Sequence, residues 1–224
     1  MRRRTFLGGA GVAATTGLSG CLGAVGLGGG NPDVTLSEPD REYDSADLPY
    51  PAWGERVPDV RVSAALADGP VAVRELQTAS FVTFFYSHCR TVCPVLVAAL
   101  RNLQARAAQS GYGDRVTFLP TTFDPARDDA ERLRAYAAEM NVDLSAGNWE
   151  FLRPASRDRA ETVVTDAFGV TFERTEPENM DQYMFAHAAL TLLVNADGYV
   201  ERAYRTKSPA EDELAADLET VIGV

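Results

Sequence analysis

The sequence predicts an α/β domain with a mixed central sheet, and two observations carry this prediction. From residue 80 to residue 168, short apolar or β-branched runs alternate with amphipathic helical patterns, which is typical of strands connected through helices. Further on, residues 188–194 and 199–204 are apolar runs joined by the turn sequence Asp197-Gly198, which favours an antiparallel pair. The 224 residues, 46% of them hydrophobic, are enough to bury one core.

Two further segments precede this region. Residues 57–62 and 70–76 alternate partly in polarity and are split by Asp68-Gly69, so they predict an inserted β-hairpin ahead of the core. The run 80–86 predicts a buried strand. The later predicted elements are a strand at 115–122 that Pro120 confines to an edge or an end, a helix at 128–140, a strand at 149–152, a helix at 156–168 capped by Ser156, a polar loop containing Pro177, the two strands named above and a helix at 208–222.

The start of the chain predicts export. Residues 1–20 combine a basic beginning, a middle rich in Gly, Ala and Val, and small residues at the end, which is the layout of a secretory signal and is too short to span a bilayer. RRTFL at 3–7 resembles the twin-arginine signal, and LSGC at 18–21 resembles a lipoprotein lipobox, so we expect lipidation at Cys21. The protein would then be exported and anchored to the outer face of the cell membrane as a lipoprotein. The alternative is a plain cleaved signal with an incidental Cys21.

The next segment predicts a spacer. Residues 21–52 are rich in Gly, Pro, Asp and Ser and show no sustained hydrophobic period, so we expect a flexible tether followed by one folded domain at 53–224. The formal net charge of the whole chain is -11. Because nucleic-acid binding needs a basic surface, we expect no nucleic-acid partner.

Two cysteines mark the predicted chemical centre. Cys89 and Cys93 lie between the strand 80–86 and a helical pattern at 95–103, and Pro94 suits a first helical turn. Residues four apart share a helix face, and a helix N-terminus lowers the pKa of a thiol, so both are expected as thiolates. Such a loop falls at the carboxyl end of a central strand, where α/β sheets bind ligands. A C-x-x-C spacing would indicate thioredoxin-type redox chemistry, whereas this longer spacing leaves a metal site as a serious competitor.

The chain has only two histidines. His187 immediately precedes an apolar strand and is expected at a strand edge or loop mouth, where most histidines are surface or hydrogen-bonded residues. Spacing alone says nothing about its distance from the cysteines. His88 is expected to point away from the adjacent Cys89 and to be structural.

These residues together resemble the Sco (SenC/PrrC) family. The resemblance lies in FYSHCRTVCP at 85–94, TFDPARD at 122–128, Asn148-Trp149, and His187 ahead of LLVNADG at 192–198, and it extends from about Trp53 to the C-terminus. It implies a thioredoxin-like fold with flanking helices and an inserted hairpin, a membrane anchor, and copper bound by two cysteines and a distal histidine. It also implies a role in metallating the dinuclear copper site of cytochrome c oxidase.

Carried over by position, the resemblance makes Cys89, Cys93 and His187 the copper ligands. Two thiolates and an imidazole suit Cu(I), and an open site of this kind also accepts Cu(II). Oxidation to a disulfide would release the metal. Asp124 and Asp128 match the acidic segment of the family, as residues around the ligands or simply as turn and helix-cap residues.

Two positions depart from the family pattern. Ala186 stands where an Asp usually precedes the ligand His, so a carboxylate that could orient the ring is missing. Arg90 stands where Pro often follows the first Cys, and its positive charge should favour thiolate.

Two functions follow from the sequence. The first is a copper metallochaperone that delivers copper to the copper-site subunit of cytochrome c oxidase or to another exported cuproprotein, carrying a metal rather than turning over a substrate. The second is an extracytoplasmic thiol:disulfide oxidoreductase in which Cys89 attacks and Cys93 resolves. A peroxidase of the same fold is a weaker third hypothesis.

Overall fold

The computed structural model describes residues 31–178 and 180–224. The predicted signal, Cys21 and the first part of the predicted tether lie outside the described residues. Among the described residues, no helix has both the length and the hydrophobicity needed to cross a membrane.

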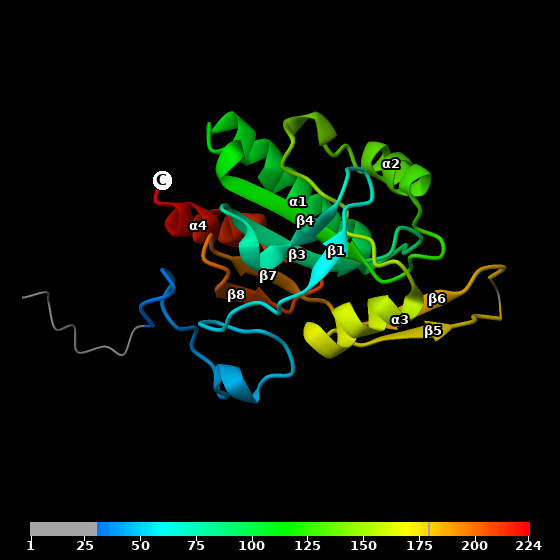
Figure 1. The fold of residues 1–224 in the computed structure, drawn as a ribbon, viewed down its shortest axis with the longest axis horizontal. Helices are drawn as coiled ribbons and strands as arrows, with labels where there is room; N and C mark the ends of the chain where they lie inside the picture. Colours follow the sequence, from blue (N-terminus) through cyan, green and yellow to red (C-terminus); the bar gives the residue numbers. More distant parts are fainter. Residues whose placement is uncertain (1–30, 179) are drawn as a thin grey trace, which may run out of the picture.

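The core is a four-stranded mixed sheet with the order β4-β3-β7-β8 (Figure 1). β3 (Ala79–Phe85) runs parallel to β4 (Val116–Thr122) and antiparallel to β7 (Thr191–Val194), which pairs antiparallel with β8 (Val200–Tyr204). Every residue of β3 is buried, because helices and loops cover both faces of this central strand. The predicted α/β class with a mixed central sheet is therefore confirmed.

Helices flank the sheet on both sides. α1 (Val92–Gln109) leaves the end of β3 and lies beside α4 (Glu211–Ile222), to which Arg106 is joined by an ion pair with Glu219. α2 (Ala130–Glu139) begins at its N-cap Asp129, whose side chain accepts from Arg132 N. α3 (Arg157–Ala160) is capped by Ser156 and continues as a π-helix, Glu161–Ala167.

Two neighbouring aromatic residues of β3 point to opposite faces of the sheet, one toward α2 and the other toward the segment that begins with α3. The ring of Phe85 stacks on Tyr136 of α2, and the ring of Phe84 contacts Phe168 just after the π-helix. α2 and the segment that starts with α3 therefore cover opposite faces of β3.

The inserted hairpin is present with shorter strands than expected. β1 (Arg61–Ser63) pairs antiparallel with β2 (Pro70–Ala72), and the turn between them includes Gly69 at φ +93°, a conformation that glycine adopts without strain.

The predicted strand at 149–152 is wrong as a regular strand. This segment follows the outer edge of β4 but forms only isolated bridges, Phe118 with Trp149 and Thr121 with Leu152. Phe118 N donates to the carbonyl of Asn148, directly before this segment, and Thr122 N donates to that of Leu152, while Pro120 between them has no N–H to donate. The proline therefore interrupts the ladder and leaves β4 as the edge strand, in agreement with the edge position predicted for Pro120.

The predicted polar loop around Pro177 contains a two-stranded ribbon. β5 (Phe172–Thr175) pairs antiparallel with β6 (Met184–His187), and Figure 1 shows the pair extending away from the central sheet. The aromatic rings of Phe172 and Phe185 pack on Phe123 at the end of β4, with centroids 4.9 and 5.4 Å away. This tertiary packing, which the polar composition of the loop concealed, holds the ribbon in place.

The flexible tether predicted at 21–52 differs from the structure over residues 31–52. Glu201 on β8 is fully buried and accepts hydrogen bonds from the backbone N–H groups of Thr35 (2.9 Å) and Leu36 (2.8 Å). The indole of Trp53 donates to the carbonyl of Leu36 at 2.8 Å. A buried carboxylate needs donors, and this segment supplies them, so the chain is attached to the domain well before residue 53.

Candidate metal centre

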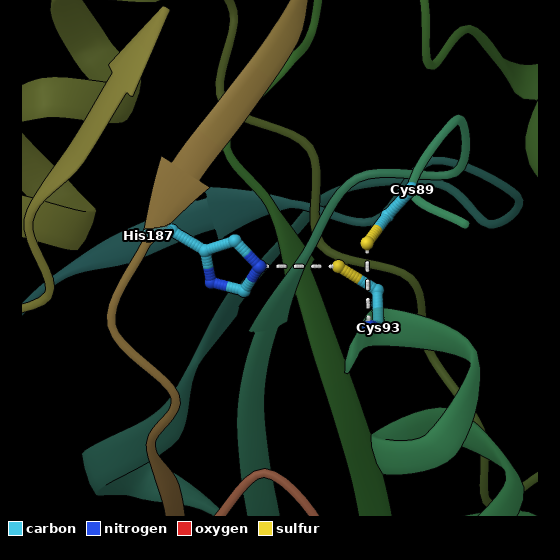
Figure 2. A group of neighbouring side chains, drawn as sticks. All are labelled: Cys89, Cys93 and His187. Atoms are coloured by element: carbon cyan, nitrogen blue, oxygen red, sulfur yellow. Dashed lines mark hydrogen bonds between the residues drawn. The ribbon is translucent and has the colours of Figure 1, made fainter. Parts of the chain in front are cut away.

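The two cysteines lie on the turn between the end of β3 and the start of α1 (Figure 2). The sharp turn begins with a hydrogen bond from Cys89 N to the carbonyl of Tyr86 at 3.2 Å. α1 starts at Val92, three residues after Cys89, so the first thiol precedes the helix and the second lies in its first turn. Both thiols are buried, with Cys89 7% exposed and Cys93 0%.

Figure 2 shows the ring of His187, at the end of β6, pointing at the two sulfurs. The distance from His187 Nε2 to Cys93 Sγ is 3.4 Å, and Cys93 N lies 3.4 Å from Cys89 Sγ. One donor atom from each of the three residues lies within 4.8 Å of the other two. The fold thus brings the two predicted thiols and the distant imidazole together.

The neighbours of His187 fix its tautomer and orientation. Its Nδ1 lies 3.0 Å from the carbonyl oxygen of Ala188, which can only accept, so the proton belongs on Nδ1 and Nε2 presents its lone pair to the sulfurs. The rings of Tyr86 and Phe123 flank the imidazole at centroid distances of 6.3 and 5.0 Å. The backbone carbonyl therefore does the orienting that the sequence comparison assigned to a carboxylate at 186.

The two thiols differ in acidity. Hydrogen bonding from the Cys93 thiol, assisted by the backbone N–H groups of Thr91 and Cys93, lowers the pKa of Cys89 to about 3 against the opposing effect of burial. Burial raises the pKa of Cys93, and its interaction with Cys89 adds to that shift. The prediction that both cysteines are thiolates is wrong for Cys93, because two adjacent buried sulfurs do not both ionise without a cation between them. In the metal-free protein, Cys89 is the thiolate and Cys93 the thiol.

The two predicted aspartates support different parts of the site. Asp128, fully buried, accepts from Ser87 N (3.1 Å), from Ser87 Oγ (2.5 Å) and from the hydroxyl of Thr122, and burial raises its pKa. It therefore fixes Ser87, the first residue of the thiol loop, which is the name used here for residues 87–93. It is not a helix cap, because Asp129 occupies that position.

Asp124 supports the ribbon. Its carboxylate accepts from Arg127 Nε at 2.6 Å and from the Tyr183 hydroxyl at 2.8 Å, and the Arg127 guanidinium stacks 3.5 Å from the Tyr183 ring. Tyr183 immediately precedes β6, so this contact fixes the base of the strand that ends in His187.

The remaining predicted positions are peripheral. His88 directs Nδ1 to Ser87 Oγ, 3.2 Å away, and away from the sulfurs, in agreement with a structural role. Ala186 and Arg90 are exposed, and Arg90 is not among the main causes of the lowered pKa of Cys89. The sequence reasoning missed Tyr86 and Phe123, which flank the imidazole, and Phe185, which packs on both of these rings. The signal for Tyr86 and Phe123 was the aromatic content of the runs at 80–86 and 118–123, whereas Phe185 stands in the polar loop.

The donor set fits a soft metal ion. Two sulfurs and a neutral imidazole nitrogen suit Cu(I), and a partly open thiolate site also accommodates Cu(II). Cys89 is already deprotonated, so loading requires the loss of only one proton, from Cys93.

Comparison with known proteins relates the chain to one family. The family model described as SCO1/SenC matches residues 71–223. The curated "SCO1 protein homolog" of Bacillus subtilis strain 168 is 28% identical over 138 residues, which cover 61% of this chain and 67% of that protein.

Solved structures share the fold at lower identity. The SCO1/SenC family lipoprotein of Bacillus anthracis strain Ames has a TM-score of 0.61 at 22% identity and covers 76% of this chain and 96% of its own. Copper-bound ScoI of Bradyrhizobium japonicum has a TM-score of 0.59 at 20% identity, with 72% and 96% covered. BsSco, of the Sco family of cytochrome c oxidase assembly proteins, in which a disulfide switch was identified, has a TM-score of 0.58 at 20% identity, with 78% and 96% covered. These matches confirm the thioredoxin-like fold, and because the family model spans more than half of its residues, the chain belongs to the SCO1/SenC family.

Proposed function

We propose that this protein is a copper metallochaperone that binds copper through Cys89, Cys93 and His187 and delivers it during assembly of the copper site of cytochrome c oxidase. The observation that carries the proposal is the convergence of two sulfurs and one imidazole within 4.8 Å from segments almost a hundred residues apart. The dithiol alone would serve redox chemistry, whereas an aligned Nε2 lone pair is what a third metal ligand requires. The copper-bound ScoI relative and the assembly role of the Sco family support it.

The experiment that tests the ligand set is a Cu(I) titration of the reduced protein against a competing chelator. His187→Ala should weaken binding by about 100-fold or more, because even outer partners of metal ligands contribute about 10- to 100-fold. His88→Ala is the matched control, since it removes the other histidine and should leave the affinity of this site unchanged. An unchanged affinity in His187→Ala would exclude the three-ligand site.

The asymmetry of the two thiols favours a second candidate function, the extracytoplasmic thiol:disulfide oxidoreductase. A thiolate at Cys89 beside a protonated, buried Cys93 is the arrangement of an attacking and a resolving thiol. Exchange with an oxidised peptide substrate in the absence of metal distinguishes the two functions. Under the metallochaperone proposal, His187→Ala abolishes copper transfer and leaves this exchange intact.

We also propose that the protein works at the outer face of the membrane, held by a lipid on Cys21. The twin-arginine pattern and the lipobox support this, as does the lipoprotein relative from Bacillus anthracis. Cells given a labelled lipid precursor should label the unaltered chain and not Cys21→Ser, and the variant should leave the membrane fraction. Equal membrane retention of both proteins would contradict the anchor.

A further inference from the structure

A second group of soft donors lies beside the candidate metal centre. A cavity of about 260 Å³ is lined by His88, Arg90, Met180, Asp181, Gln182 and Met184. The whole chain has only four methionines, and two of them line this one cavity together with the only histidine outside the candidate centre. Thioethers select Cu(I), and imidazole accepts copper as well, so this combination has a clear ligand chemistry.

The cavity adjoins the candidate metal centre through shared segments. His88 directly precedes Cys89, and Met184 lies on β6, the strand that ends in His187. The Met184 sulfur is 4.0 Å from the Tyr86 hydroxyl, and the ring of Tyr86 flanks His187. Tyr86 thus contacts both a residue of the cavity wall and the imidazole of the inner site.

The donors of the cavity are available to a metal ion. His88 uses Nδ1 toward Ser87, and its Nε2 has no hydrogen-bond partner among the described residues. Met180 is 36% exposed, so its side chain is accessible from solvent. Arg90 and Asp181 on the wall carry opposite charges, so the cavity does not repel a monovalent cation.

We propose that this cavity is an outer Cu(I) site in which the thioethers of Met180 and Met184 and the imidazole of His88 bind the ion. Its use as a station for copper moving to or from the inner centre rests on the proposed metallochaperone function, whereas its ability to bind Cu(I) does not. Neutral thioethers hold the ion more weakly than thiolates, so the outer site fills only after the inner one.

The experiment isolates the outer site by removing every thiol. The full chain carrying C21S, C89S and C93S, with ¹³C-labelled methionine methyl groups, is titrated with Cu(I) under anaerobic conditions. The methyl signals of Met180 and Met184, assigned from single Leu variants, should shift, while that of Met140 at the end of α2 should not. M180L and M184L should each weaken binding by about tenfold or more, and M140L is the matched control.

Binding that survives the M180L/M184L double variant, or methyl signals that do not move, would overturn the proposal. If the thiol-free chain does not fold, the unaltered protein is loaded with one equivalent of Cu(I), and the methyl shifts are followed during the second equivalent. The H187A variant separates the outer-site proposal from the proposed metallochaperone function. Loss of the inner site weakens binding of the first equivalent of Cu(I) and leaves the methionine shifts in place.

Discussion

The two halves of the candidate metal centre are attached to the protein in different ways. The thiol loop is held by directional hydrogen bonds from Ser87 and Thr122 to the buried carboxylate of Asp128. His187 ends a ribbon whose strands are mostly exposed or half-buried, and which meets the domain through aromatic rings and the Asp124–Tyr183 contact. Segments with few buried contacts open at lower free energy, so we expect the sulfurs to form a fixed base and the imidazole to be the part that opens.

The difference between the two halves should be greatest in the ionisation of Cys89, which belongs to the fixed base. Its pKa of about 3 lies far below the ordinary value near 9, and the largest cause is Cys93, within the same loop. Cys89 should therefore react with iodoacetamide as a thiolate at pH 5, where an ordinary thiol is protonated. Because the pKa of Cys89 is lower in the folded protein than in the unfolded chain, its ionisation stabilises the fold at pH values above the unfolded-state pKa. This contribution is lost as the pH falls toward 3.

The measurement is the pH dependence of single-site alkylation, read by mass spectrometry. Cys93→Ala should raise the apparent pKa of Cys89 by more than His187→Ala does, because the first removes the largest cause of the lowered pKa, whereas Nε2 of His187 has no proton to donate to the thiolate. An equal or larger shift in His187→Ala would show that the ribbon, and not the loop, prepares the thiolate.

The next effect is on stability and concerns the base of the loop. Asp128→Ala leaves the Ser87 N–H and the hydroxyls of Ser87 and Thr122 without their acceptor, and should lower the free energy of unfolding by about 3 kcal/mol. Urea denaturation measures the loss. Asp129→Ala, next in the chain, removes only the N-cap of α2 and should cost about 1 kcal/mol. Equal costs for the two variants would contradict the anchoring role of Asp128.

Weakening the ribbon should separate the two halves. Phe185 is half-buried against Tyr86 and Phe123, with ring centroids 5.2 and 5.4 Å away, so Phe185→Ala should cost about 2 kcal/mol of stability. Cu(I) affinity should fall toward that of His187→Ala, while Cys89 alkylation stays fast. Leu218→Ala on α4 is the control, because it destabilises the core far from the ribbon and should leave affinity unchanged. A fall of the same size in that control would show that affinity follows global stability.

The same contrast explains how much the sequence could predict. The thiol loop was predictable because its evidence is contiguous: an apolar run, two cysteines and a proline within fifteen residues. The ribbon was not, because Phe172 and Phe185 act through rings distant in the chain, Phe123 for both and also Tyr86 for Phe185. The proton on Cys93 follows from its complete burial, and the attachment of residues 31–52 follows from a buried Glu201, and neither burial has a local sequence signal.

The smallest effect concerns Ala186, where the family resemblance led us to expect Asp. Ala186 is exposed and lies directly opposite Glu173 in the ribbon, while its neighbours Phe185 and His187 face the domain. An aspartate here would project away from the imidazole, because adjacent strand residues point to opposite faces. Ala186→Asp should therefore change Cu(I) affinity by less than about threefold and cost about 0.5 kcal/mol, since it places two like charges opposite each other. Ala186→Asn keeps the shape without the charge and should cost less. A tenfold gain in Cu(I) affinity with Ala186→Asp but not with Ala186→Asn would contradict this, because it would require the ribbon to twist and bring position 186 to the ring. His187 would then be oriented by a side chain as well as by the Ala188 carbonyl.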